Sequence, residues 1–177
     1  MLSGSCVATS RLALSSPADA QRIALEPAVD DGLAINGAIT CPLTVGSEFV
    51  NSWGDSRSGG RQHQGVDMAA PQGTAVVAAG AGTAEFTVSN AGGNAIWLTT
   101  PEGDKFYYAH LDDWNGESRE VQPGEVIDYV GSTGNARGNH LRFETHPGGT
   151  PTNPYPIVVQ ACTDAGADVS GSNQRNP

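Results

Sequence analysis

The stretch Asn139-His140-Leu141-Arg142-Phe143-Glu144 alternates polar residues with apolar ones. This alternation predicts a β-strand, in which successive side chains point to opposite faces. We expect the strand to cover residues 140–145 and to end before the turn sequence Pro147-Gly148-Gly149. His140 and Arg142 are therefore expected to project from the same face of one strand.

The segments before this strand have the same character, with short β-prone runs separated by turn residues. The 23 glycines and 11 prolines, together 34 of 177 residues, are typical of a turn-rich β domain. No long amphipathic helix is indicated between Cys41 and Cys162. We predict a mainly β fold, a twisted antiparallel sheet arranged as a sandwich or a partly open barrel. The other expected strands cover residues 74–79, 83–88, 95–99, 105–111 and 127–131.

The composition divides the chain into three parts. Residues 1–38 are rich in Ala and Ser and are interpreted as a weakly ordered arm or linker, which contains Cys6. Residues 39–163 are predicted to form the β domain, and 164–177 a flexible tail. No apolar run is long enough for a transmembrane helix, and no signal peptide is visible near the start of the chain. A missing true N-terminus and cytoplasmic residence would explain that equally well.

The charge of the chain limits its partners. The formal net charge is -10, with only nine Lys and Arg residues and no basic run. Nucleic acid and anionic membranes both attract basic patches, so neither is expected as a partner. The acidity is interpreted as a means of keeping the protein soluble.

Cys41 and Cys162 stand at the two ends of the predicted β domain. A disulfide between them would close a loop of about 120 residues, which stabilises by roughly 4–5 kcal/mol in the chain-entropy estimate. Such a bond is expected mainly in an exported protein. Two reduced, buried thiols are the alternative.

Upstream of the strand, His63-Gln64-Gly65-Val66-Asp67 has the spacing of a metal-binding pair. An imidazole and a carboxylate are common zinc donors. A histidine at position 142, two residues after His140, would supply a third donor. Arg142 has no lone pair for a metal and keeps its proton at any relevant pH. The sequence therefore indicates a zinc site in which an arginine has replaced one ligand.

Several motifs in a fixed order resemble the lysostaphin/LytM-type zinc endopeptidases, which cut peptide stems or cross-bridges of peptidoglycan. The resemblance covers residues 41–162 and implies a groove across a twisted antiparallel sheet. The motifs are 49–54, 57–61, 63–67, 70–71, 73–74, 108–111, 130–136, 140–144 and 153–156.

The resemblance assigns a role to each matching residue. His63 and Asp67 match two metal ligands, so Zn²⁺ is the implied cofactor. His110 and His140 match the metal-free histidines that position and deprotonate the attacking water or stabilise the oxyanion. Arg142 matches the third ligand, and there the family pattern fails.

Two further hypotheses concern the altered position. His146 would replace the missing ligand only through a sharp bend, because it lies roughly 13 Å beyond Arg142 along an extended strand. It is interpreted instead as a loop histidine. The Arg142 guanidinium is expected to project into the metal position and to pair with Asp67, two N–H donors on two oxygens.

Three functions follow from this arrangement. The favoured one is a catalytically impaired module that binds cell-wall peptide or regulates a partner cell-wall hydrolase. The second is an active zinc endopeptidase with an unusual or recruited ligand, which retention of His63, Asp67, His110 and His140 supports. The third is a purely structural β domain. The substrate of the family places the protein outside the cell or in the cell envelope.

Overall fold

The computed structural model describes residues 34–113 and 117–166. Cys6, nearly all of the expected arm and most of the expected tail lie outside the described residues. Within the described part, no helix is long and apolar enough to cross a membrane.

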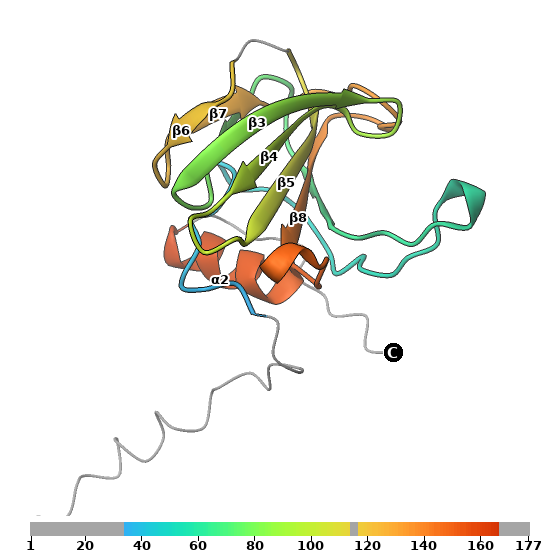
Figure 1. Cartoon of the computed structure of the whole chain (residues 1–177). Coiled ribbons are helices and arrows are strands. Elements are labelled where there is room, and N and C mark those ends of the chain that lie inside the picture. Colours follow the sequence, from blue (N-terminus) through green and yellow to red (C-terminus); the bar gives the residue numbers. More distant parts are fainter. Residues whose placement is uncertain (1–33, 114–116, 167–177) are drawn as a thin grey trace, which may run out of the picture. The chain divides into compact units, whose positions relative to one another are not determined.

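Six antiparallel strands form the main sheet, in the order β1-β8-β5-β4-β3-β6 (Figure 1). A second sheet pairs β2 with β7. The predicted mainly β, antiparallel fold is confirmed. The strands are β1 (Val66–Ala69), β2 (Ala75–Val77), β3 (Gly82–Ser89), β4 (Gly93–Thr99), β5 (Lys105–Leu111), β6 (Arg119–Val121), β7 (Val126–Tyr129) and β8 (His140–His146).

The alternation along the strands separates a buried face from a groove face. On β8, Leu141 and Phe143 are fully buried, and they contact the core residues of neighbouring strands. The rings of Phe106 and Tyr108 lie 5.8 Å and 5.2 Å from that of Phe143. The intervening residues of β8 project from the opposite face, so the core is built on one side of the sheet and the other side remains available for a site.

A helix, α2 (Tyr155–Asp164), follows the last strand (Figure 1). The predicted flexible tail, residues 164–177, overlaps this helix only at Asp164. The rest of the helix was not predicted from the sequence. Pro156 lies in the first turn, where its missing N–H breaks no helical hydrogen bond. Val158 and Cys162 are buried in the core, and this packing stabilises a helix that its β-branched residues alone would not favour.

Cys41 and Cys162 form a disulfide, as their positions suggested. It links the segment before β1 to α2 across 121 residues of sequence. Both residues are buried and belong to the hydrophobic core. The bond therefore joins the two ends of the β domain within the core itself.

Residues 52–64 form a projecting segment that we call the arm loop (Figure 1). Its two sides are paired through Ser56 and Gln62 and through the bond from the Arg57 amide to the Arg61 carbonyl, 2.8 Å long. A short 3-10 turn, η2 (Ser58–Gly60), lies at its tip, where Gly59 and Gly60 adopt positive φ angles. The arm loop brings Arg57, Arg61 and His63 to the groove side of β1.

Candidate functional site

The pairing of β1 with β8 places the metal-motif residues side by side. Asp67 lies opposite Arg142, and Ala69 lies opposite His140. On the other edge of β8, Ala109 of β5 is the partner of Arg142. The strand register thus brings two motifs together that are about 75 residues apart in the sequence.

The Asp67 carboxylate lies at the centre of the site. Arg142 Nε donates to Oδ1 at 3.1 Å, and Arg57 Nη2 donates to Oδ2 at 3.1 Å. Burial raises the pKa of Asp67, but the close contact with His63 and the charge and hydrogen bond of Arg142 outweigh it and hold that pKa well below its usual range. Asp67 is therefore a charged carboxylate shared by two guanidinium groups.

His63 is buried below this carboxylate. Its Nδ1 lies 3.1 Å from the Ser52 carbonyl oxygen and 3.0 Å from Ser52 Oγ. Its Nε2 lies 3.0 Å from Asp67 Oδ1, yet it makes no well-oriented hydrogen bond. His63 Nε2 and the Asp67 carboxylate therefore lie in direct contact, with the imidazole buried and the carboxylate partly exposed.

His110 reaches the groove because β5 is irregular at this residue. Asn94 pairs with Leu111 and Ala95 with Ala109, so His110 is an extra, bulged residue. Its φ of 65° is the one positive value among the described non-glycine residues. In a regular strand, His110 would share the core side with Phe106 and Tyr108, and the bulge turns it toward His140 instead.

The loop after β7 holds this bulge in place. The Gly131 amide donates to the His110 carbonyl at 3.0 Å, and His110 Nδ1 donates to the Thr133 carbonyl at 2.9 Å. A Cβ on Gly131 would lie 2.5 Å from the Asp112 backbone, so only glycine permits this approach. Because Nδ1 carries the proton, Nε2 of the neutral ring is an acceptor, and it has no hydrogen-bond partner.

The two histidines predicted to be catalytic lie together. The ring centres of His110 and His140 are 4.7 Å apart, and His140 Nε2 lies 3.7 Å from Asp67 Oδ1. Burial lowers the pKa of His110 to about 4, which keeps it neutral near pH 7. The structure brings the two rings together and His140 close to Asp67, and their catalytic assignment stays a prediction.

The residues present do not fit the zinc site that the family implies. His63 and Asp67 are suitable donors, but both oxygens of Asp67 accept hydrogen bonds from guanidinium groups. In the described part of the chain, no group of three or more His, Cys, Asp or Glu residues could hold a metal ion. Position 142 offers a cation where a zinc site needs a lone pair.

His146 does not join the site. It is the last residue of β8 and not a loop residue, which corrects that interpretation. Its Nε2 lies 2.9 Å from Glu144 Oε2, and its ring packs edge-on against Trp97 at 4.9 Å. The strand continues straight through Thr145, so the bend that a substitute ligand requires does not occur.

Arg57 is the residue of the candidate site whose contact with Asp67 the sequence did not predict. A bidentate bond from Arg142 alone was expected, whereas each of the two arginines binds one oxygen of Asp67. The available signal was the Arg57-Ser58-Gly59-Gly60-Arg61 stretch directly before His63, in which two glycines allow a tight turn. That stretch alone does not reveal which way its side chains point.

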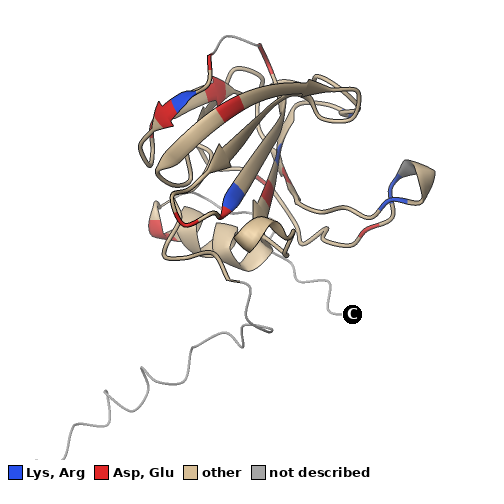
Figure 2. Ribbon diagram, in the orientation of Figure 1, with Lys and Arg blue, Asp and Glu red and all other residues tan. Residues whose placement is uncertain are grey.

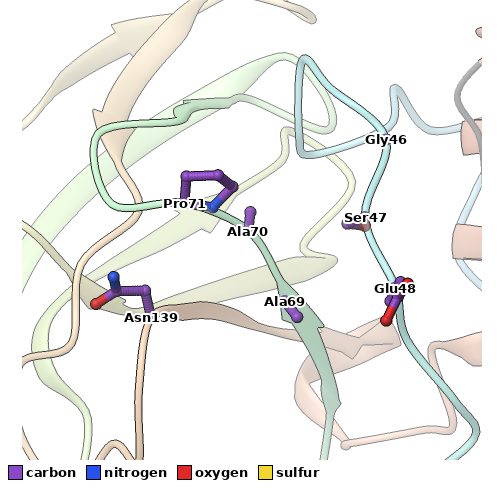
Figure 3. A pocket seen from close by; sticks show the side chains of 7 residues that line it. All are labelled: Gly46, Ser47, Glu48, Ala69, Ala70, Pro71 and Asn139. Atoms are coloured by element: carbon purple, nitrogen blue, oxygen red, sulfur yellow. The ribbon is translucent and has the colours of Figure 1, made fainter.

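Two hollows flank the site. A groove of about 600 Å³ lies between the arm loop and β8. Another hollow, of about 480 Å³, adjoins the end of β1 and contains few charged groups (Figure 3). The groove is lined by Ser56, Arg57, Gly60, Arg61, Gln62, His63, Gln64, Ala91, Asn135, Arg142 and Glu144, and the other hollow by Gly46, Ser47, Glu48, Ala69, Ala70, Pro71 and Asn139.

Two similar proteins are named as peptidoglycan peptidases or carboxypeptidases. "DD-carboxypeptidase/endopeptidase Mpg" of Neisseria meningitidis is 41% identical over 100 residues, which cover 56% of this chain and 23% of that protein. "Peptidoglycan DD-endopeptidase ShyC" of Vibrio cholerae is 33% identical over 101 residues, with 56% and 23% covered. The chain thus spans about a quarter of the length of these curated relatives.

A solved structure with the same fold is the catalytic domain of lysostaphin from Staphylococcus simulans. It is 32% identical, with a TM-score of 0.56, over 61% of this chain and 89% of that domain. Residues 61–154, just over half of the chain, match Peptidase family M23. The chain therefore belongs to Peptidase family M23, which confirms the resemblance to LytM-type peptidases.

Proposed function

We propose that this chain is an M23 domain that binds the peptide of peptidoglycan without cutting it. It would act outside the cell or in the cell envelope, as a cell-wall-binding module or as a regulator of a partner hydrolase. The observation that carries this proposal is the Asp67 carboxylate, whose two oxygens accept from Arg142 and Arg57 at 3.1 Å each. The resemblance to LytM-type peptidases assigns that carboxylate to the metal.

The positive charge of Arg142 compensates the charge of Asp67. A guanidinium carries a positive charge and pairs with a carboxylate in a planar geometry through charge-assisted hydrogen bonds. Zinc, when bound, supplies an acidified water and a polarised carbonyl, neither of which a guanidinium provides. The arginines therefore preserve the electrostatic balance around Asp67 but not the hydrolytic chemistry.

One observation favours the alternative of an active zinc endopeptidase. Nε2 of buried His63 has no hydrogen-bond partner, and His140 Nε2 lies 3.7 Å from Asp67 Oδ1. If Arg142 swung aside, these three residues would form an unusual donor set. His140 would then no longer serve as a free imidazole, so this arrangement loses one of the two predicted catalytic histidines.

Metal content distinguishes the two functions. Purified chain and the Arg142→His variant are dialysed against zinc and washed, and bound zinc is measured by mass spectrometry. We expect little zinc in the unmodified chain and about one equivalent in Arg142→His, because three protein ligands make a stable site. The matched control is Arg119→His, which introduces the same residue at β6, where Arg119 instead pairs with Glu125.

Near-stoichiometric zinc in the unmodified chain, together with release of peptides from peptidoglycan, would contradict the proposal. A sedimentation assay with insoluble peptidoglycan then tests the binding half. We expect the unmodified chain to sediment with peptidoglycan and to release no soluble fragments. Failure to sediment would favour a structural β domain instead.

A further inference from the structure

We propose that Asp112, Asp113 and Asp128 form a pH-sensitive clamp, which holds the end of β5 against β7 in mild acid and loosens toward neutral pH. We call these three residues the acidic cluster. The inference goes beyond the proposed function and does not depend on it, because none of the three residues lines the groove or the other hollow.

Backbone hydrogen bonds bring the acidic cluster together from two segments. The Asp112 amide donates to the Tyr129 carbonyl at 2.9 Å, and Leu111 forms a β-bridge with Val130. The Asp113 amide donates to the Asp128 carboxylate. Asp112 and Asp113, which directly follow β5, therefore lie beside Asp128 on β7. Figure 2 shows that acidic positions gather around β6 and β7.

Asp128 is a buried carboxylate that only backbone amides neutralise. Its residue is 7% exposed, and its Oδ1 accepts from the Tyr129 amide at 2.6 Å. The second amide donor is that of Asp113. In the part of the chain that the structure describes, Asp128 forms no ion pair. A buried charge without a cation beside it is costly, even when amides bind it.

The neighbouring elements supply no compensating charge. Strand β2 places Val76 opposite Asp128 and contains no charged residue. On β6, Arg119 pairs with Glu125 instead. Gln72, whose Nε2 donates to Asp112 Oδ1, is neutral. The charged groups that act on Asp128 are thus the other two carboxylates of the acidic cluster.

This arrangement makes Asp128 sensitive to pH in a mildly acidic range. Burial raises the pKa of Asp128 to about 6, the two amide bonds oppose this rise, and the charges of Asp113 and Asp112 add to it. Near neutral pH, Asp128 is ionised, and three like charges lie together. In mild acid, Asp128 is protonated, and both the buried charge and the repulsion are removed.

The direction of the effect follows from linkage. If the end of β5 separates from β7, Asp128 gains solvent and loses its two acidic neighbours, so its pKa returns toward the ordinary 3.8. Between these two pKa values, the attached form binds a proton that the separated form does not. The advantage of the attached form is complete below this range and is lost as the pH rises through it. The two pKa values limit the change in the opening equilibrium to about a hundredfold.

The clamp lies next to the bulge that turns His110 into the groove. Leu111 and Asp112 directly follow His110, and the Gly131 amide, two residues beyond Tyr129, donates to the His110 carbonyl at 3.0 Å. The contacts of the clamp and those of the bulge therefore belong to one continuous stretch of backbone pairing. Opening of the clamp would release one side of the support of His110.

Hydrogen exchange of the backbone amides tests the clamp. Protection of the Asp112 and Asp113 amides is measured by NMR at about pH 4.5 and about pH 7.5, corrected for intrinsic exchange. We expect protection to be at least about tenfold lower at the higher pH. The amides of Phe106 and Tyr108 are the internal reference, because β5 is paired on both edges there. Equal protection of Asp112 and Asp113 at the two pH values would overturn the inference.

Variants assign the effect to Asp128. Asp128→Asn keeps the size and an acceptor oxygen but has no charge, so we expect its protection at about pH 7.5 to match that of the unmodified chain at about pH 4.5. The matched control, Glu102→Gln, removes an exposed carboxylate in another turn and should keep the full pH dependence. His110 titrates in both chains, so their difference isolates Asp128. A pH dependence that persists in Asp128→Asn would overturn the inference.

A direct titration keeps the test independent of how well Asp128→Asn folds. The carboxyl carbon of Asp128 is followed by NMR in the unmodified chain, and we expect its midpoint near 6. Asp113→Asn, at an exposed position, should lower that midpoint because it removes a neighbouring negative charge. An Asp128 midpoint near the ordinary 3.8 would overturn the inference, whereas zinc content and peptidoglycan sedimentation decide the proposed function separately.

Discussion

The two faces of β8 contrast sharply although they belong to one strand. Leu141 and Phe143 are fully buried and pack in the core, as any sheet of this kind requires. Arg142 and Glu144, between and after them, lie on the groove face and interact with charged partners. The core face stabilises the fold, whereas the groove face carries the charged residues of the candidate site.

This separation explains why a charged residue at position 142 is compatible with the fold. The Arg142 side chain is 19% exposed and its charge is balanced by Asp67, so it is not an unpaired buried charge. Substitution on the groove face therefore alters what is bound more than it alters stability. The following predictions test that contrast by free energies of unfolding.

The largest effect is expected on the core face. Phe143→Ala removes a ring that lies within 6 Å of two other aromatic rings and is fully buried. We expect it to reduce the free energy of unfolding by about 3–5 kcal/mol in urea titrations. A loss below 1 kcal/mol would show that the two faces do not differ in this way.

The next effect is a pH dependence at the groove. His110 is neutral in the fold, with a pKa lowered to about 4 from an ordinary 6.5 by burial. Between these values the unfolded chain binds a proton that the fold does not, so stability falls as the pH drops from 6.5 to 4, by on the order of 3 kcal/mol. His110→Asn, which tolerates a positive φ, should flatten the profile. An unchanged profile would contradict this assignment.

A smaller loss is expected from Asp67→Asn. The substitution leaves two guanidinium groups without their shared charge, and charge-assisted hydrogen bonds contribute about 1.5–3 kcal/mol each when fully buried. Asp67 is 30% exposed, so solvent screening reduces this, and we expect a total of about 1–2 kcal/mol by chemical denaturation. A stabilised variant would mean that the two arginines do not depend on Asp67.

The smallest effect concerns Glu144 and His146, a pair at 2.9 Å on the groove face. A double-mutant cycle with Glu144→Gln and His146→Gln should give a coupling of about 1 kcal/mol. We expect the circular dichroism of both variants to remain that of the native sheet. Coupling as large as the Phe143 effect would contradict the idea that the groove face contributes little to stability.

The sequence predicted the strands better than the helix. The run 105–111 coincides with β5 because its alternation is bounded by turn residues on both sides. Helix α2 was missed because Tyr155-Pro156-Ile157-Val158-Val159 has weak helix propensity, and tertiary packing of Val158 and Cys162 overrides it. The local sequence pattern is enough to predict a half-buried strand, but it does not predict a helix that is stabilised by packing against neighbouring elements.

The site was predictable to the extent that strand register determines it. Asp67 and Arg142 were expected to meet, and β1 and β8 pair them directly. The bulge at His110 was not predictable from the sequence. The face of the sheet to which a side chain points is inferred from the period of two along a strand, and an extra residue breaks that period. Arg57 was missed for a related reason, since the course of the arm loop is fixed by turn geometry and long-range contacts.

The disulfide affects how the domain responds to proteolytic cleavage. The tip of the arm loop, residues 59–62, is exposed, and exposed turns are preferred cleavage sites. A cut there separates the segments that contain Cys41 and Cys162, yet the bond between these residues keeps both fragments in one molecule. The nicked protein would migrate as a single band until it is reduced, with the sheet still assembled around the cut.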